Sequence, residues 1–192
     1  MFASMAGPPP CLLLELTRRY SEPHRHYHTI EHIAAMLHHG RGLQLSDAQL
    51  LAIWFHDAVY DPRALDNEER SAALAVQLLP AAGFAAPLVA LVQRIVLDTK
   101  THVPSLPESA AVIDLDLGSL ALPWEKFRRN SAFIRAEYAH VPDAEFVAGR
   151  RAFLQRMLDR PRLFWTAFGA PLEPLARGNL ARAIAADQAP GR

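Results

Sequence analysis

Sulfur ligands are almost absent from this sequence. Cys11 is the only cysteine among the 192 residues, which excludes a disulfide framework and a metal site built from thiolates. A single thiol fits a reducing compartment, so we expect a cytoplasmic protein. The apolar run at residues 11–14 is cut by Glu15 and follows no basic leader, and no run approaches the roughly 20 residues that a membrane helix needs. We therefore expect neither a signal peptide nor membrane insertion.

An excess of charge of either sign is also missing. Basic and acidic residues number 20 each, so no overall field would attract a polyanion or an anionic membrane. We expect neither a nucleic acid polymer nor a membrane as a partner. Of the 20 basic residues, 18 are arginines, which suits bidentate contacts to phosphate but equally reflects genome composition.

Sustained alternation with β-branched residues, the pattern of strands, is missing as well. Apolar residues recur at helical spacing, so we predict a compact all-α fold with residues 1–10 as a flexible tail and residues 11–188 as a single domain. Capping boxes are expected at Ser46 with Gln49 and at Asp66 with Glu69. The expected helices cover residues 11–20, 29–39, 47–57, 67–79, 85–98, 107–117, 124–139, 143–159 and 172–187.

Histidines and aspartates occur in clusters that suit a metal ion. His28 and His32 are four residues apart and would share one face of a helix that begins between them. His56 and Asp57 directly follow an apolar run at residues 50–55, which would carry them to the floor of a pocket. A buried and unpaired carboxylate there would be costly, so a cation is its natural partner.

These clusters resemble the signature of the HD-domain superfamily of metal-dependent phosphohydrolases, which is a His, an adjacent His-Asp pair and a distal Asp, all on helices. The segment Tyr27–His32 is similar to the Tyr-His-Asn-x-x-His segment of cyclic-nucleotide phosphodiesterases in that superfamily, with Thr29 in place of Asn. The resemblance implies that His28 is the general acid. It also implies four metal ligands: His32, His56, Asp57 and Asp116.

A closer resemblance is to small bacterial proteins identified as predicted metal-dependent HD phosphohydrolases. It spans about residues 20–182 in five blocks: Arg25–Thr29, Trp54–Asp61, Asn67–Ala72, Asp114–Leu117 and Glu173–Leu180. It implies an HD-type helical fold with the metal site between central helices, but no named substrate.

The distal aspartate has two candidates, because Asp114 and Asp116 are two residues apart and lie on different faces of a helix. Superfamily members place this ligand in an Ala-Asp-x-Leu context, which favours Asp116. The other reading of Asp114 is that it accepts a hydrogen bond from a ligand imidazole.

The resemblance implies hydrolysis of a phosphoester or phosphoanhydride bond in a small molecule and, by family analogy alone, in a nucleotide or related metabolite. Imidazole and carboxylate ligands suit one divalent ion among Mn, Fe, Co, Ni, Zn and Mg. Asp57 or a nearby carboxylate would orient the attacking water, while His28 would protonate the leaving oxygen. Glu68 could also orient that water, or it could simply be a first-turn carboxylate favoured by the helix dipole.

Two loops adjoin the proposed ligands, at residues 58–66 and 99–106, and we expect both to border the pocket. Arg25 and Lys100 are the basic residues nearest the site in sequence, so each is either a contact for the substrate phosphate or a solvated surface cation. His102 could serve a second metal, contact phosphate or be an ordinary loop histidine.

Three alternatives stay open. A di-iron oxygenase of the same superfamily would need further ligands from His28, His102 or Glu68. A catalytically silent module would use its metal only to stabilise the fold or to bind a ligand. A homodimer is also possible, because apolar residues 163–168 could form either core or a dimer face.

Overall fold

The computed structural model describes residues 7–186. Within that range the regular structure is entirely helical, which confirms the expected all-α class. Three short 3-10 helices, η1 (Gly40–Gly42), η2 (Gly118–Ala121) and η3 (Ala170–Leu172), connect longer elements. The α-helices are α1 (Pro10–Tyr20), α2 (Ile30–His39), α3 (Asp47–Phe55), α4 (Asn67–Ala81), α5 (Ala86–Thr99), α6 (Pro107–Leu117), α7 (Trp124–Glu137), α8 (Asp143–Leu158) and α9 (Glu173–Ala186).

The expected helices are all present, and their ends differ from the expected ones by at most two residues. α1 begins at Pro10, which we had assigned to the N-terminal tail; residues 1–6 of that tail lie outside the described range, as do residues 187 and 188 of the expected domain. α3 ends at Phe55, so His56 and Asp57 stand just beyond the helix and not within its last turn.

One of the two expected capping boxes is present. Ser46 and Gln49 exchange side-chain and backbone hydrogen bonds at the start of α3. The box expected at Asp66 was wrong, because its side chain accepts no capping hydrogen bond and Glu69 pairs instead with Lys100.

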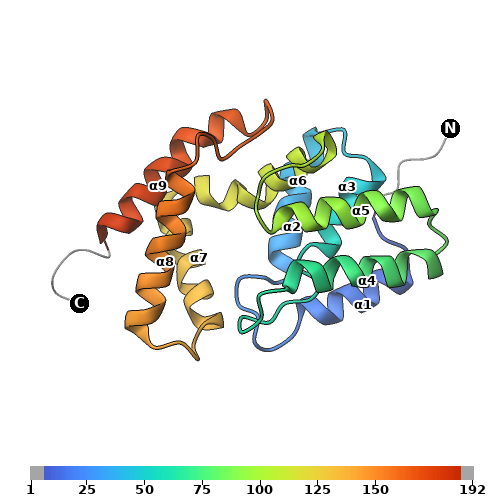
Figure 1. Cartoon of the computed structure of the whole chain (residues 1–192), viewed down its shortest axis with the longest axis horizontal. Helices are drawn as coiled ribbons and strands as arrows, with labels where there is room; N and C mark the ends of the chain where they lie inside the picture. Colours follow the sequence, from blue (N-terminus) through green and yellow to red (C-terminus); the bar gives the residue numbers. More distant parts are fainter. Residues whose placement is uncertain (1–6, 187–192) are drawn as a thin grey trace.

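Two hydrophobic cores share one helix. The first core packs α1 to α5, whereas the second packs α7 to α9, and α6 lies between these groups (Figure 1). Val112 and Leu115 of α6 point into the first core, while Ile113 and Leu117 point into the second. Because each pair is three or four residues apart, each forms one stripe of the helix. α6 therefore holds the two parts of the molecule together.

The apolar residues of the segment 163–168 pack into the two cores. Leu163 and Phe164 are buried in it, and Trp165 packs against it, whereas Phe168 packs against the first core. These side chains are core and not a free face, so they give no support to a dimer.

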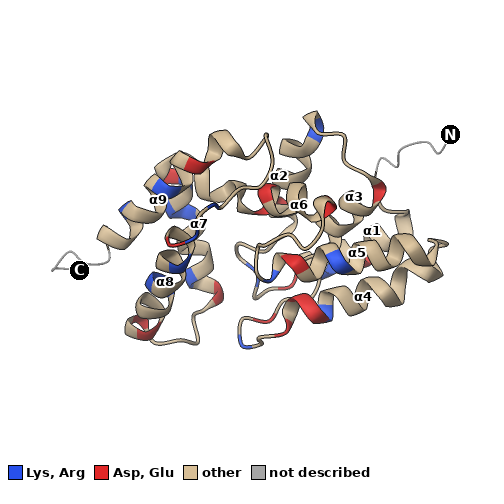
Figure 2. Ribbon diagram, turned by 45° about the horizontal axis from the view of Figure 1, so that its top comes forward, with Lys and Arg blue, Asp and Glu red and all other residues tan. Residues whose placement is uncertain are grey.

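No helix among residues 7–186 combines the length and apolar character needed to cross a lipid bilayer. Acidic and basic residues are interspersed along the ribbon, with several basic positions on α8 and α9 (Figure 2).

Candidate metal centre

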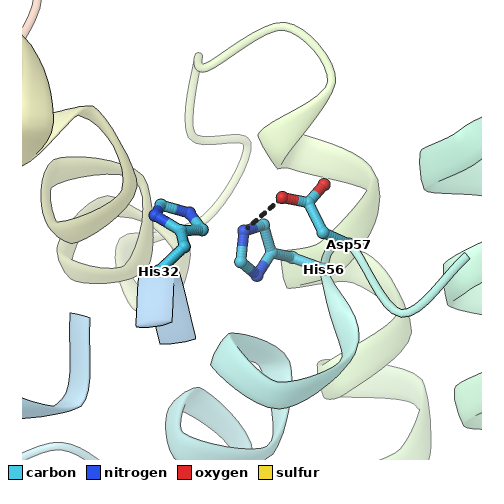
Figure 3. Close-up of side chains that lie close together, drawn as sticks. All are labelled: His32, His56 and Asp57. Carbon is cyan, nitrogen blue, oxygen red and sulfur yellow. Dashed lines mark ion pairs between the residues drawn. The ribbon is translucent and has the colours of Figure 1, made fainter. Parts of the chain in front are cut away.

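Three side chains from two helix ends form a compact group of metal-ligating atoms. His32 comes from the first turn of α2, where the side chain of Thr29 caps the helix by accepting a hydrogen bond from the backbone of Glu31. His56 and Asp57 follow the buried helix α3. One ligand atom from each of His32, His56 and Asp57 lies within 4.8 Å of the other two. Figure 3 shows the two imidazole rings side by side, with the carboxylate turned toward His56.

The buried imidazole of His56 faces two carboxylates, and this arrangement needs a cation between them. Its Nδ1 donates a hydrogen bond to the carbonyl of Ile53 at 2.9 Å, which leaves Nε2 as the ligating nitrogen. Nε2 lies 3.0 Å from Asp57 Oδ2 and 3.7 Å from Asp116 Oδ1, yet it makes no hydrogen bond. A lone pair facing two carboxylates is repulsive unless a proton or a metal ion stands between them.

The carboxylates around His56 also shift the pKa values of this group. Burial opposes a charge on His56, but the carboxylates of Asp57 and Asp116 outweigh it and raise the pKa of His56 to about 9. Burial would likewise raise the pKa of Asp57, but His56 and His28 hold that pKa below its usual range. When His56 is neutral, as a metal ligand must be, Asp57 and Asp116 leave an excess of negative charge that attracts a cation.

Asp116 brings α6 into the centre and links it to His102. Its Oδ1 lies 3.1 Å from Nε2 of His32, and its Oδ2 lies 3.2 Å from Nε2 of His102. Burial would raise the pKa of Asp116, but the hydrogen bonds from His102 and His32 hold it well below its usual value. His102 has a φ of 52°, a left-handed conformation that is uncommon outside glycine. The expected choice of Asp116 over Asp114 as the residue at this centre agrees with these positions.

Asp114 instead fastens the segment that follows α8. It is fully buried and accepts hydrogen bonds from the backbone N–H groups of Trp165 and Thr166 and from the hydroxyl of Thr166. None of these donors is an imidazole, so its expected role beside a ligand histidine was wrong. The indole of Trp165 donates in turn to the carbonyl of His102 at 3.3 Å, and Asp114 thereby supports the loop that carries His102.

A buried carboxylate that the sequence did not indicate holds His28. Oε2 of Glu137 accepts from Nδ1 of His28 at 2.7 Å and from the hydroxyl of Tyr60 at 2.9 Å. Its Oε1 accepts from the backbone N–H groups of His26, Tyr27 and His28. Burial alone would raise the pKa of Glu137, but these donors lower it to about 2. Glu137 is therefore a carboxylate, and His28 donates through Nδ1.

His28 gains a proton more readily than a free histidine. Burial disfavours its imidazolium, but the carboxylates of Asp57 and Glu137 outweigh this effect and raise the pKa of His28. Its ring stacks on Tyr60 with a centroid distance of 4.1 Å and lies 6.4 Å from the ring of His32. The proposed acid therefore stands beside the metal group and outside it.

A cavity of about 640 Å³ opens from the metal centre toward α7 and α8. As expected, both loops border it, through Tyr60 and Leu65 on one and Lys100 and His102 on the other. Glu68 also lines the cavity, where burial raises its pKa. The amine of Lys100 contacts Glu69 and the carbonyl of Leu65, so it joins the two loops at the rim.

The expected substrate role of Arg25 does not fit its position. Its side chain is buried and donates to the carbonyls of His28, Asp57 and Ala58, as well as to the carboxylate of Glu22. Arg25 holds the turn before α2 against the end of α3 and is not among the residues that line the cavity. The arginines that do line it are Arg150 and Arg156 of α8, which the sequence analysis did not single out.

The chain matches no protein-family model, no curated protein and no solved structure. The chemistry of the centre must therefore be inferred from its own residues. Two imidazoles and the carboxylate of Asp57 could hold a metal ion, with Asp116 beside the imidazoles. His28 and basic side chains line the adjoining cavity.

Proposed function

We propose that this chain is a metal-dependent phosphohydrolase of the HD type, which cleaves a phosphoester or phosphoanhydride bond in a small molecule. The observation that carries the proposal is the buried Nε2 of His56, which faces the carboxylates of Asp57 and Asp116 without a hydrogen bond. A cation would satisfy this arrangement, and His28 and several basic side chains line the adjoining cavity.

His32, His56, Asp57 and Asp116 would hold one divalent ion, of the set Mn, Fe, Co, Ni, Zn and Mg. Such an ion supplies a Lewis acid that polarises a phosphoryl oxygen and lowers the pKa of water. The Nδ1 bond from His56 to Ile53 orients the ring in advance and fixes its tautomer, as supporting hydrogen bonds do for metal-ligating histidines.

His28 would donate a proton to the leaving oxygen. Glu137 occupies Nδ1, so the transferable proton is carried by Nε2. The raised pKa of His28 keeps more of the imidazole protonated at neutral pH than in a free histidine, which suits a general acid.

Basic side chains in the cavity would bind the phosphate. Arg150 and Arg156 lie on α8 and Lys100 lies at the rim. Arginine forms bidentate hydrogen bonds with phosphate oxygens, so the two arginines take the role that Arg25 was expected to have. Glu68, a neighbour of Asp57 in the cavity wall, would orient water.

The first test is elemental analysis of untagged protein, followed by assays of phosphorylated metabolites with the metal that is found. We expect one divalent ion per chain, its loss in the His56→Ala and Asp57→Ala variants, and turnover of at least one phosphorylated compound. His28→Ala should retain the ion and lose about 10²-fold or more in turnover. A His28→Ala variant as active as the parent would contradict the acid assignment, and a chain that holds no metal after reloading would contradict the whole proposal.

One feature favours the di-iron alternative. The two oxygens of Asp116 face different imidazoles, Oδ1 toward His32 and Oδ2 toward His102, so His102 could supply a ligand to a second ion beside Asp116. Two iron atoms per chain, with oxygen consumption and no phosphate release, would support that reading. One tightly held ion with neither activity would support a silent module.

A further inference from the structure

The cavity continues from the metal centre between α7 and α8, where its walls carry both apolar and polar side chains. α7 contributes Phe127 and Ile134, and α8 contributes Phe146 and Phe153. Each pair is seven residues apart, or two helical turns, so the two side chains of each pair lie on one face of their helix. Asn130 and Ser131 of α7 and Gly149 and Arg150 of α8 line the cavity between them. We call the part of the cavity between these faces of α7 and α8 the α7–α8 groove. It is continuous with the site proposed for phosphate.

Gly149 lies in this groove between the two phenylalanines of α8, three residues after Phe146 and four before Phe153. Glycine is unfavourable in the interior of a helix. Its φ is not positive, and a Cβ at this position would meet no atom within 4 Å. Neither backbone conformation nor close packing therefore requires the glycine, and its missing side chain leaves this part of the cavity wall open.

The groove suits a flat ring better than a bulky or branched group. A bare backbone at Gly149 leaves a shallow space between two aromatic side chains, and aromatic rings pack well edge-to-face or offset against each other. The guanidinium carbon of Arg150 lies 5.4 Å from the ring centroid of Phe153, so a planar cation also borders the space.

We propose that the α7–α8 groove binds an aromatic ring in the leaving group of the substrate, above Gly149 and between Phe146 and Phe153. This inference rests on the proposed function, because it assumes that the phosphate lies at the metal centre. The substrate is then a phosphate ester of an alcohol that carries an aromatic ring.

The test compares 2-phenylethyl phosphate, hexyl phosphate and ethyl phosphate, which share the same type of leaving oxygen. The variant is Gly149→Leu, which fills the groove. The matched control is Gly178→Leu, because Gly178 is also an exposed glycine within a helix, has no atom within 4 Å of a built Cβ and does not line the cavity. Circular dichroism and Tm check that both variants fold, and neither should lose stability.

We expect kcat/KM to be about tenfold higher for 2-phenylethyl than for ethyl phosphate in the parent and in the control, the size that stacking of one ring provides. In Gly149→Leu this ratio should fall below about threefold. Binding of 2-phenylethylphosphonate and ethylphosphonate, which cannot be hydrolysed, should show the same preference by calorimetry.

The outcomes separate this inference from the proposed function. Hydrolysis without a preference for the ring, or an unchanged ratio in Gly149→Leu, overturns the groove and leaves the hydrolase. A rate for hexyl phosphate equal to that for 2-phenylethyl phosphate overturns the aromatic assignment. Ring-dependent binding that Gly149→Leu abolishes, without hydrolysis of any probe, supports the groove and overturns the hydrolase. Absence of both binding and hydrolysis overturns both.

Discussion

At the scale of single residues, His56 combines roles that are usually separate. It ends a buried helix, its Nδ1 is held by a backbone carbonyl, and its Nε2 faces two carboxylates. In the absence of a metal ion, a proton is the cation that reconciles these contacts, which is why the pKa of His56 is about 9. Metal binding and protonation would therefore compete for the same nitrogen.

Metal binding should release protons. Below the His56 pKa of about 9 the free site carries a proton on that imidazole, and a divalent ion displaces it. We expect the release of up to about one proton per ion at pH 7 and weaker binding as the pH falls. Calorimetry in buffers with different ionisation enthalpies measures this number directly. A heat that is independent of the buffer would contradict the competition.

The lowered pKa of Glu137 predicts how the free energy of unfolding depends on pH. Its pKa is lowered from 4.5 to about 2 in the folded chain, so its contribution is full above pH 4.5 and is lost as the pH falls toward 2. The raised pKa of His28 has the opposite effect. Its contribution to the free energy of unfolding is full below pH 6.5, its unfolded pKa, and is lost as the pH rises through its pKa in the folded chain. The pair should be most stabilising between these limits.

The comparison is between the metal-free parent and its Glu137→Gln variant in urea. Their difference in unfolding free energy should decrease by about 3 kcal/mol in total between pH 4.5 and 2, the amount that the pKa shift implies. It should also decrease, by a smaller amount, at alkaline pH. A difference that does not change with pH would show that Glu137 acts through packing alone.

At the scale of elements, the contact between α6 and the segment before α9 depends on the absence of a side chain at Gly169. Asp114 reaches the backbone at residues 165 and 166 past Gly169, where an added Cβ would lie 2.3 Å from Oδ2 of Asp114 and 2.7 Å from Cβ of Phe164. No side chain fits there without movement of this segment.

The variant Gly169→Ala should lower the unfolding free energy by about 1–3 kcal/mol, the usual cost of overpacking. Gly178→Ala, the control in α9, has open space around its Cβ and should raise stability by up to about 1 kcal/mol, because alanine favours a helix interior over glycine. Urea titration compares the two variants, and equal effects in both would contradict the close approach at Gly169.

Helix positions followed from the sequence because apolar spacing is a local property, and the real ends lie within two residues of those expected. Caps were harder to predict. Ser46 caps as expected, whereas the side chain of Asp66 accepts no capping hydrogen bond, and Glu69 pairs with Lys100, which follows α5. A contact between residues this far apart in the chain leaves no mark in the local pattern.

At the scale of the whole molecule, the two cores should unfold together. α6 contributes side chains to both, so neither core remains complete if the other opens. Trp54 packs against the first core, while Trp124 and Trp165 pack against the second. Variants that keep Trp54 alone or Trp165 alone should show the same urea midpoint by fluorescence. Separate midpoints would mean that the two parts unfold independently.

Only part of the candidate site was predictable from the sequence, because some of its contacts join residues that are far apart in the chain. His32, His56 and Asp57 stand in short motifs and come together as expected, with Asp116 beside them. Glu137 lies 109 residues from His28, and its only sequence signal is a carboxylate one turn after Ile134 on the same face of α7. Arg25 was nearest in sequence, but the fold buries it and presents the arginines of α8 instead.

The order of the elements along the chain has a consequence for synthesis. Every residue of the proposed metal centre has been made once the ribosome has passed Asp116, whereas Glu137, which holds His28, follows later at the end of α7. The side chains proposed to hold an ion are thus all synthesised before the residue that holds the proposed acid. Because α6 also packs into the second core, the proposed centre would be complete only after α7 to α9 have emerged.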